Sequence, residues 1–123
     1  MTPDSTIVRI DREGYSILQL QCKAMNWANH AELREAFAAM KGQPIRAVVV
    51  DFSSVEDMDS VALGSLFSGR IQLRRQAEII FCHINDRVSH LLRHTQIDKV
   101  FSIHGDLPSA EKAAQEIARQ ADR

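Results

Sequence analysis

The segment 46–52, Arg-Ala-Val-Val-Val-Asp-Phe, constrains the fold of this chain more than any other stretch. Its apolar residues are consecutive rather than alternating, and three of them are β-branched valines. A strand that is apolar on both sides must be covered on both sides, as central strands of parallel sheets are. The segment therefore predicts a sheet with helices packed against both faces.

The rest of the chain supplies strands and helices in alternation. Short apolar runs predict further strands at 7–10, 16–21, 78–84 and 100–103. Apolar residues three and four positions apart predict four helices, whose inner faces are Leu33, Ala36, Phe37 and Met40; Leu63, Leu66, Phe67 and Ile71; Val88, Leu91, Leu92 and Thr95; and Ala110, Ala113, Ala114, Ile117 and Ala121. The order ββαβαβαβα predicts an α/β fold with a mixed, mainly parallel sheet of about four to five strands and about four helices. We expect one domain over residues 1–123.

Residues with short polar side chains stand at the expected first positions of the helices. Such side chains accept hydrogen bonds from the unpaired amides of a first helical turn. The candidates are Asn29, the pair Asp59-Ser60, Asn85 or Asp86, and Asp106 or Ser109. Gly42 and Pro44 end the first helix, and the second helix is expected over 61–75.

Composition excludes several classes of function. Fifteen basic and sixteen acidic residues give a formal net charge of −1, which provides no electrostatic reason to bind nucleic acid or an anionic membrane. No apolar run is long enough for membrane insertion, and 1–10 does not resemble a secretory leader, so we expect a cytoplasmic protein. Cys22 and Cys82 lie in apolar stretches and are expected to be buried free thiols.

The segment 48–66 carries the most functional information. A buried strand ends near Asp51, a loop follows, and a helix opens with Asp59 and Ser60. Ser60 is thus expected at or beside the N-cap, where its hydroxyl can bond a free amide. A phosphate there would meet the positive end of the helix dipole and add roughly −1.5 to −2 charges.

This segment resembles the STAS family, the domain of bacterial anti-sigma-factor antagonists and sulphate-transporter tails. The family pattern is a strand ending in Asp, a short loop, an Asp-Ser pair and a helix start; the matching residues are Asp51, Asp59, Ser60, Leu63, Gly64 and Leu66. The segments 81–92 and 95–101 resemble the next strand and helix of the family and its turn into the last strand. The likeness covers nearly the whole chain.

The resemblance implies an anti-sigma-factor antagonist that acts by partner switching in the regulation of transcription. The implied partners are an anti-sigma factor or serine kinase of the histidine-kinase-like ATPase type, and a serine phosphatase that acts on phosphorylated Ser60. Phosphorylation of Ser60 would break the complex, because charge and desolvation disfavour a phosphate in a tight interface. The expected partner-binding residues are Ser53, Ser54, Glu56, Asp57, Met58, Asp59, Ser60, Val61 and Gly64.

The chain departs from the family pattern at three places. Ala62 replaces a usual glycine, the segment 22–26 lacks a glycine-glutamate-leucine-aspartate motif, and 75–77 lacks a glycine pair. We therefore expect no nucleotide cofactor. No catalytic set, phosphate loop or dinucleotide motif appears, so we expect no enzymatic activity.

Other interpretations of the same residues remain open. The chain could be a constitutive STAS scaffold, or an accessory subunit of a transport ATPase or sensory complex, with Ser60 an ordinary helix cap. Asp51, Asp57 and Asp59 suggest a phosphoacceptor site of receiver type, but the remaining acidic pair and lysine of such domains are missing.

Three further groups of residues have both a structural and a functional interpretation. His90 and His94 lie four residues apart without a third ligand, so we expect a solvated pair rather than a metal site. Met25 and Trp27 could form a docking patch or close the end of the core. Ser65 and Ser68 are expected at exposed helix positions.

Overall fold

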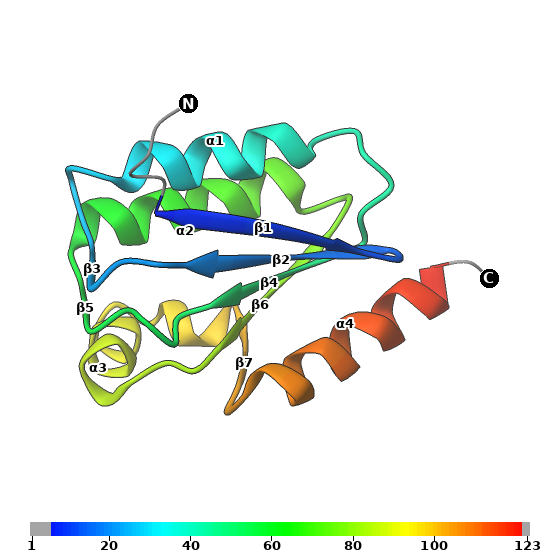
Figure 1. Ribbon diagram of the computed structural model, residues 1–123. Helices are drawn as coiled ribbons and strands as arrows, with labels where there is room; N and C mark the ends of the chain where they lie inside the picture. Colours follow the sequence, from blue (N-terminus) through cyan, green and yellow to red (C-terminus); the bar gives the residue numbers. More distant parts are fainter. Residues whose placement is uncertain (1–5, 122–123) are drawn as a thin grey trace.

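A five-stranded mixed sheet forms the centre of the molecule, in the order β1-β2-β4-β6-β7 (Figure 1). The computed structural model describes residues 6–121. The strands are β1 (Ile7–Arg12), β2 (Tyr15–Leu20), β4 (Ala47–Asp51), β6 (Glu78–Cys82) and β7 (Ser102–His104). Only the β1–β2 pair of this sheet is antiparallel; β2, β4, β6 and β7 run parallel to one another. The predicted mixed, mainly parallel sheet is confirmed.

Four helices cover the two faces of this sheet. They are α1 (His30–Met40), α2 (Ser60–Leu73), α3 (Asp86–His94) and α4 (Leu107–Ala121), with a short 3-10 turn, η1 (Ile97–Lys99). Side chains of α1, α2 and α3 pack with Val48 and Val50 of β4, whereas Ala110 and Ala114 of α4 pack with Ala47 and Val49. The alternate residues of β4 therefore face two separate hydrophobic clusters, and the prediction that 46–52 is covered on both sides is confirmed.

A second, very small sheet lies beside the main one. It pairs β3 (Ala24–Met25) with β5 (Asp57–Met58) in parallel. The sequence did not predict these strands, because two residues carry no periodicity. Their pairing holds the segment before α1 against the loop before α2.

Several predicted inner faces differ from the structure. Leu33, Phe37 and Met40 of α1 are buried as expected, but Thr95 and Ala121 are exposed, and Ala118 replaces Ala121 in the core. Phe67 and Ile71 of α2 also face outward, with exposed fractions of 37% and 49%. Spacing alone assigned them to the core because they are apolar and adjoin the buried stripe of Leu63 and Leu66.

Ser65 is the polar residue whose burial differs most clearly from the prediction. It was expected on the surface, yet only 3% of it is exposed. Its hydroxyl Oγ lies 2.8 Å from Nδ1 of His30, so a hydrogen bond joins α1 to α2. Burial of the hydroxyl is possible because this partner satisfies it.

The predicted helix caps are partly confirmed. Asn85 Oδ1 accepts from Val88 N at 2.8 Å, and Asp106 Oδ1 accepts from Ser109 N at 2.9 Å, so both cap as expected. Asn29 occupies the N-cap position of α1, but its side chain bonds the backbone of Asn26 and Ala24 instead of the helix. No helix within residues 6–121 is both long and apolar enough to cross a membrane.

Candidate functional site

The start of α2 is built around the carboxylate of Asp59. Asp59 is the N-cap residue, with extended backbone at φ −99° and ψ 175°. Its Oδ1 accepts from Ala62 N at 2.9 Å, and its Oδ2 accepts from Trp27 N at 3.0 Å. The capping role thus belongs to Asp59, and Ser60 is the first helical residue, beside the cap and exposed.

Three hydrogen bonds that involve backbone atoms of the loop before α2 hold it in place. Ser53 N donates to Asp51 Oδ1 at 3.0 Å, where the loop leaves β4. Glu56 N donates to Lys23 O at 2.7 Å, next to the β3–β5 pair. Asn85 Nδ2 donates to Glu56 O at 3.0 Å, from the start of α3. The loop therefore presents its side chains from a defined position.

Most of the predicted partner-binding residues share the surface around this loop. Asp59 is half-buried, and Met58 is 7% exposed and belongs to the core. The residues with exposed side chains or surfaces are Ser53, Ser54, Glu56, Asp57, Ser60, Val61 and Gly64. Ser60 is thus an accessible serine on this surface, and the prediction that Met58 binds a partner directly is wrong, because its side chain is buried in the core.

Apolar residues outside the predicted partner-binding set extend this surface. Ser60, Gly64, Phe67 and Ile71 are all exposed and recur every three or four residues, so they form one outward stripe along α2. Trp27 is 74% exposed, and its backbone is tied to Asp59. The prediction left the position of Trp27 open; its side chain faces solvent, whereas Met25 is fully buried.

The charge near Ser60 is acidic. Asp57 and Asp59 precede the serine by three residues and one residue. Arg87 Nη1 lies 3.8 Å from Asp57 Oδ2, but both side chains are more than half exposed, so water screens this pair strongly. An additional anion on Ser60 would meet both the carboxylates and the positive end of the α2 dipole.

Comparison with known families assigns this architecture. The family model described as STAS domain matches residues 4–110. The chain belongs to the STAS domain family. No protein with a curated description matches the sequence significantly.

Several solved structures share the fold at low sequence identity. An anti-sigma factor antagonist from Mycobacterium paratuberculosis is 24% identical, with a TM-score of 0.76 and coverage of 93% of this chain and 97% of that one. A sulfate transporter family protein from Wolinella succinogenes has a TM-score of 0.79 at 10% identity, covering 89% and 92%. The anti-sigma factor antagonist SpoIIAA, solved in its unphosphorylated form, has a TM-score of 0.69 at 11% identity, covering 90% and 96%. These likenesses concern the fold.

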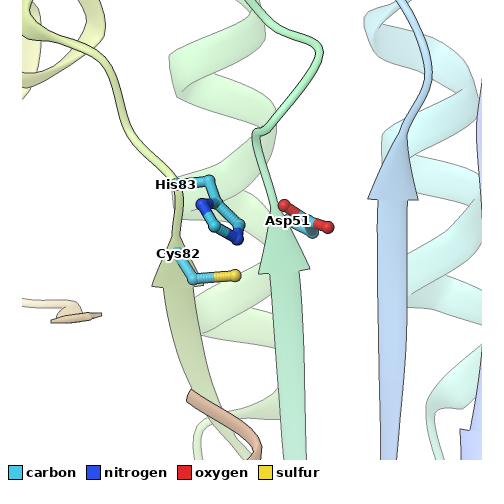
Figure 2. Close-up of side chains that lie close together, drawn as sticks. All are labelled: Asp51, Cys82 and His83. Atoms are coloured by element: carbon cyan, nitrogen blue, oxygen red, sulfur yellow. The ribbon is translucent and has the colours of Figure 1, made fainter. Parts of the chain in front are cut away.

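A second group of ionisable side chains lies at the carboxyl ends of two central strands in this STAS domain. Asp51, Cys82 and His83 come together where β4 and β6 end (Figure 2). Cys82 is buried, as predicted, whereas Cys22 is only half-buried and lies outside the strands. Burial raises the pKa of the Cys82 thiol to about 12, and the negative charge of Asp51 and a hydrogen bond with it act in the same direction.

Proposed function

We propose that this STAS domain is an anti-sigma-factor antagonist that works by partner switching under the control of Ser60. In this proposal the unmodified domain binds an anti-sigma factor or a serine kinase of the histidine-kinase-like ATPase type. The kinase phosphorylates Ser60 and the complex dissociates, and a serine phosphatase restores the binding form. The observation that carries the proposal is the exposed Ser60 at the first position of α2, beside a cap that another residue provides.

The role of Asp59 as the cap is important for the chemistry. Because the Asp59 carboxylate satisfies the free amide of Ala62, the Ser60 hydroxyl is not needed to hold the helix start. A kinase can therefore modify it at little cost to the fold. The phosphate is also tolerated at the amino end of a helix, where it meets the positive end of the dipole.

The same phosphate would change the surface strongly. It adds roughly −1.5 to −2 charges within a few residues of Asp57 and Asp59. A partner that packs on this surface would have to bury that charge, which is costly without a matching cation. Phosphorylation would thus act on the complex while leaving the folded domain intact.

The outward stripe of α2 supports a partner rather than a purely structural role for this region. Phe67 and Ile71 continue from Ser60 along the helix, and their side chains contribute exposed apolar area next to the switch residue. Exposed apolar surface of this kind is typical of interfaces. The domain would dock with this stripe and the Ser53–Asp59 loop.

The proposal is tested by combining mass spectrometry with binding. The chain recovered from its native host is analysed by intact mass and by peptide mapping over 53–70. Binding to the co-purifying kinase is then measured for Ser60→Ala and Ser60→Asp. We expect phosphate on Ser60, retained binding by Ser60→Ala, and binding weaker by at least about tenfold, or about 1.4 kcal/mol, for Ser60→Asp.

A matched control uses a serine in the first turn of another helix. Ser109 is exposed in the first turn of α4, which packs on the opposite face of the sheet. Ser109→Asp introduces the same charge in a similar helical position, and we expect it to bind like the unmodified chain. A Gly64→Arg variant, placed where a side chain meets open space, should block the stripe without disturbing the fold.

A constitutive scaffold is the second candidate, favoured by the fold similarity to the sulfate transporter family protein. Such a domain would bind its partner whatever the state of Ser60. In that case Ser60→Ala and Ser60→Asp would bind equally well, and no phosphate would be found under any growth or stress condition. That result would exclude the switch.

A further inference from the structure

Three side chains with metal-binding atoms gather at the carboxyl ends of two neighbouring strands. They are Asp51 at the end of β4, Cys82 at the end of β6, and His83 directly after it. A carboxylate oxygen, the thiol sulfur and an imidazole nitrogen all lie within 4.8 Å of one another. Figure 2 shows the Cys82 sulfur and the His83 imidazole extending from the end of β6 toward Asp51 at the end of β4.

The parallel register brings the first two residues together. Asp51 pairs with Cys82 across the β4–β6 ladder, so their side chains leave the sheet on the same side. The group is therefore built on two central strands rather than on surface loops. Asp51 is 5% exposed and Cys82 is fully buried, so packing fixes both positions.

The third residue reaches the group because of an unusual backbone conformation. Successive residues of a strand point to opposite faces, so His83 would ordinarily face away from Cys82. Its φ is instead +58°, in the left-handed region, and this turn leaves the imidazole near Asp51 and Cys82. A left-handed conformation is unfavourable for residues with a side chain and points to a constraint at this position.

We propose that Asp51, Cys82 and His83 form a binding site for a divalent metal ion of the zinc class. Sulfur and imidazole nitrogen together favour Zn²⁺ and Co²⁺ over Mg²⁺ and Ca²⁺, which prefer ligands that are all oxygen. Zinc bonds of about 2.0–2.3 Å place tetrahedral ligand atoms roughly 3.3–3.8 Å apart. Side-chain rotations that move the outermost ligand atoms by about 1 Å would therefore close the group on an ion.

The surrounding contacts leave these ligands usable. Asp51 Oδ1 accepts from Ser53 N at 3.0 Å, and the Asp51 carboxylate also forms a hydrogen bond with the Cys82 thiol. Binding of the ion releases the thiol proton to solvent, so bonds from the thiolate and a carboxylate oxygen to the ion replace that hydrogen bond. His83 Nε2 accepts from Leu107 N at 3.2 Å. An ion on Nε2 replaces only that one long bond, whose donor belongs to the first turn of α4.

The fourth coordination position is left for water. His104 pairs with Cys82 across the β6–β7 ladder, but its Nε2 lies 3.2 Å from Ser102 Oγ. Asp106 caps α4 through Ser109. Within residues 6–121 the ligand atoms that meet the 4.8 Å distance come from Asp51, Cys82 and His83 alone, so three protein ligands with one open position are expected.

The site is tested by titrating the untagged full chain with Co²⁺ and following the thiolate-to-cobalt charge-transfer band. We expect one ion per chain, displacement by Zn²⁺, and no displacement by Mg²⁺. Cys82→Ala should abolish the band, and Asp51→Asn and His83→Gly should weaken binding by at least about tenfold. Glycine suits the left-handed backbone at 83, so His83→Gly separates loss of a ligand from loss of the fold.

Controls distinguish this group from the other candidate ligands. Cys22→Ala removes the second thiol, and His90→Ala breaks the exposed pair of His90 and His94, whose rings are stacked 6.2 Å apart. Both variants should bind cobalt like the unmodified chain. The proposal is overturned if the folded chain gives no charge-transfer band. It is equally overturned if Cys82→Ala and His83→Gly bind normally while Cys22→Ala or His90→Ala loses the ion.

Discussion

Gly69 of α2 lies directly against the aromatic ring of Phe37 of α1. A Cβ atom on Gly69 would lie 2.6 Å from Cγ and 2.7 Å from Cε2 of that ring, well inside normal contact. Gly64, five residues earlier in the same helix, has no atom within 4 Å of the corresponding position. The two glycines thus mark the opposite faces of α2: one packs on α1, and the other faces the surface proposed for the partner.

Alanine at these two positions should have opposite effects on stability. Gly69→Ala should lower the free energy of unfolding by about 1–3 kcal/mol, because the methyl group forces Phe37 out of its packed position. Gly64→Ala should raise it by about 0.5–1 kcal/mol, because alanine favours the helix and meets open space. Urea unfolding of both variants measures the difference. Equal effects would show that α2 does not pack on Phe37 through Gly69.

Removal of the Asp59 carboxylate should destabilise the start of α2. Asp59→Ala loses the bonds to Ala62 N and Trp27 N and should cost about 1–2 kcal/mol of unfolding free energy. Asp59→Ser should recover much of this, since serine also caps helices. Glu56→Ala is the control, because it removes an exposed carboxylate from the same loop while the bonds to Lys23 and Asn85 are made by the backbone of residue 56, and we expect a change within about 0.5 kcal/mol. Urea unfolding compares the three variants.

The fold was predictable from the sequence where burial on two faces left a clear pattern. Residues 47–50 are consecutive apolar residues because β4 contacts helices on both sides, and this pattern predicted helices on both faces of the sheet. The same spacing argument wrongly predicted that Phe67 and Ile71 are buried. Apolar spacing does not distinguish a helix face that packs on the core from one that faces outward.

The candidate site was predictable only in its local part. Asp59 and Ser60 form a recognisable helix start, and the structure places them there. The hydrogen bond between Ser65 and His30 joins residues 35 positions apart, and neither residue type indicates such a partner. The approach of His83 to Asp51 depends on a left-handed φ at residue 83. The presence of a histidine in the sequence does not predict that backbone conformation.

In the metal-free chain, the Cys82 thiol should make stability depend on pH in the alkaline range. Its pKa rises from an ordinary value near 9 to about 12 on folding, chiefly because of burial. The folded state therefore holds a proton that the unfolded state loses, so this contribution is full below pH 9 and declines between pH 9 and about 12. The slope is at most about 1.4 kcal/mol per pH unit. Urea unfolding between pH 8 and 10.5 measures it.

Comparison with Cys82→Ala isolates this contribution. Burial also raises the pKa of Tyr15, whose hydroxyl donates to Glu111 Oε1 at 2.8 Å, so more than one group acts in alkali. Tyr15 is present in both proteins, and its effect cancels in the difference. The unmodified chain should lose stability faster than Cys82→Ala as the pH rises. Parallel curves would contradict a buried, protonated Cys82.

Trp27 should report directly on a partner that covers Ser60. It is the only tryptophan of the chain, it is 74% exposed, and its backbone N–H donates to Asp59 beside Ser60. In the free protein, iodide should quench its fluorescence efficiently, because the indole is in water. A bound partner should shift the emission to shorter wavelength and reduce quenching, and Ser60→Asp should prevent both changes. Subtracting the spectrum of the Trp27→Phe complex removes the partner's own emission. A complex in which Trp27 stays fully quenchable would place the interface elsewhere on the domain, because a partner seated over the start of α2 would cover Trp27, whose backbone N–H is bonded to Asp59.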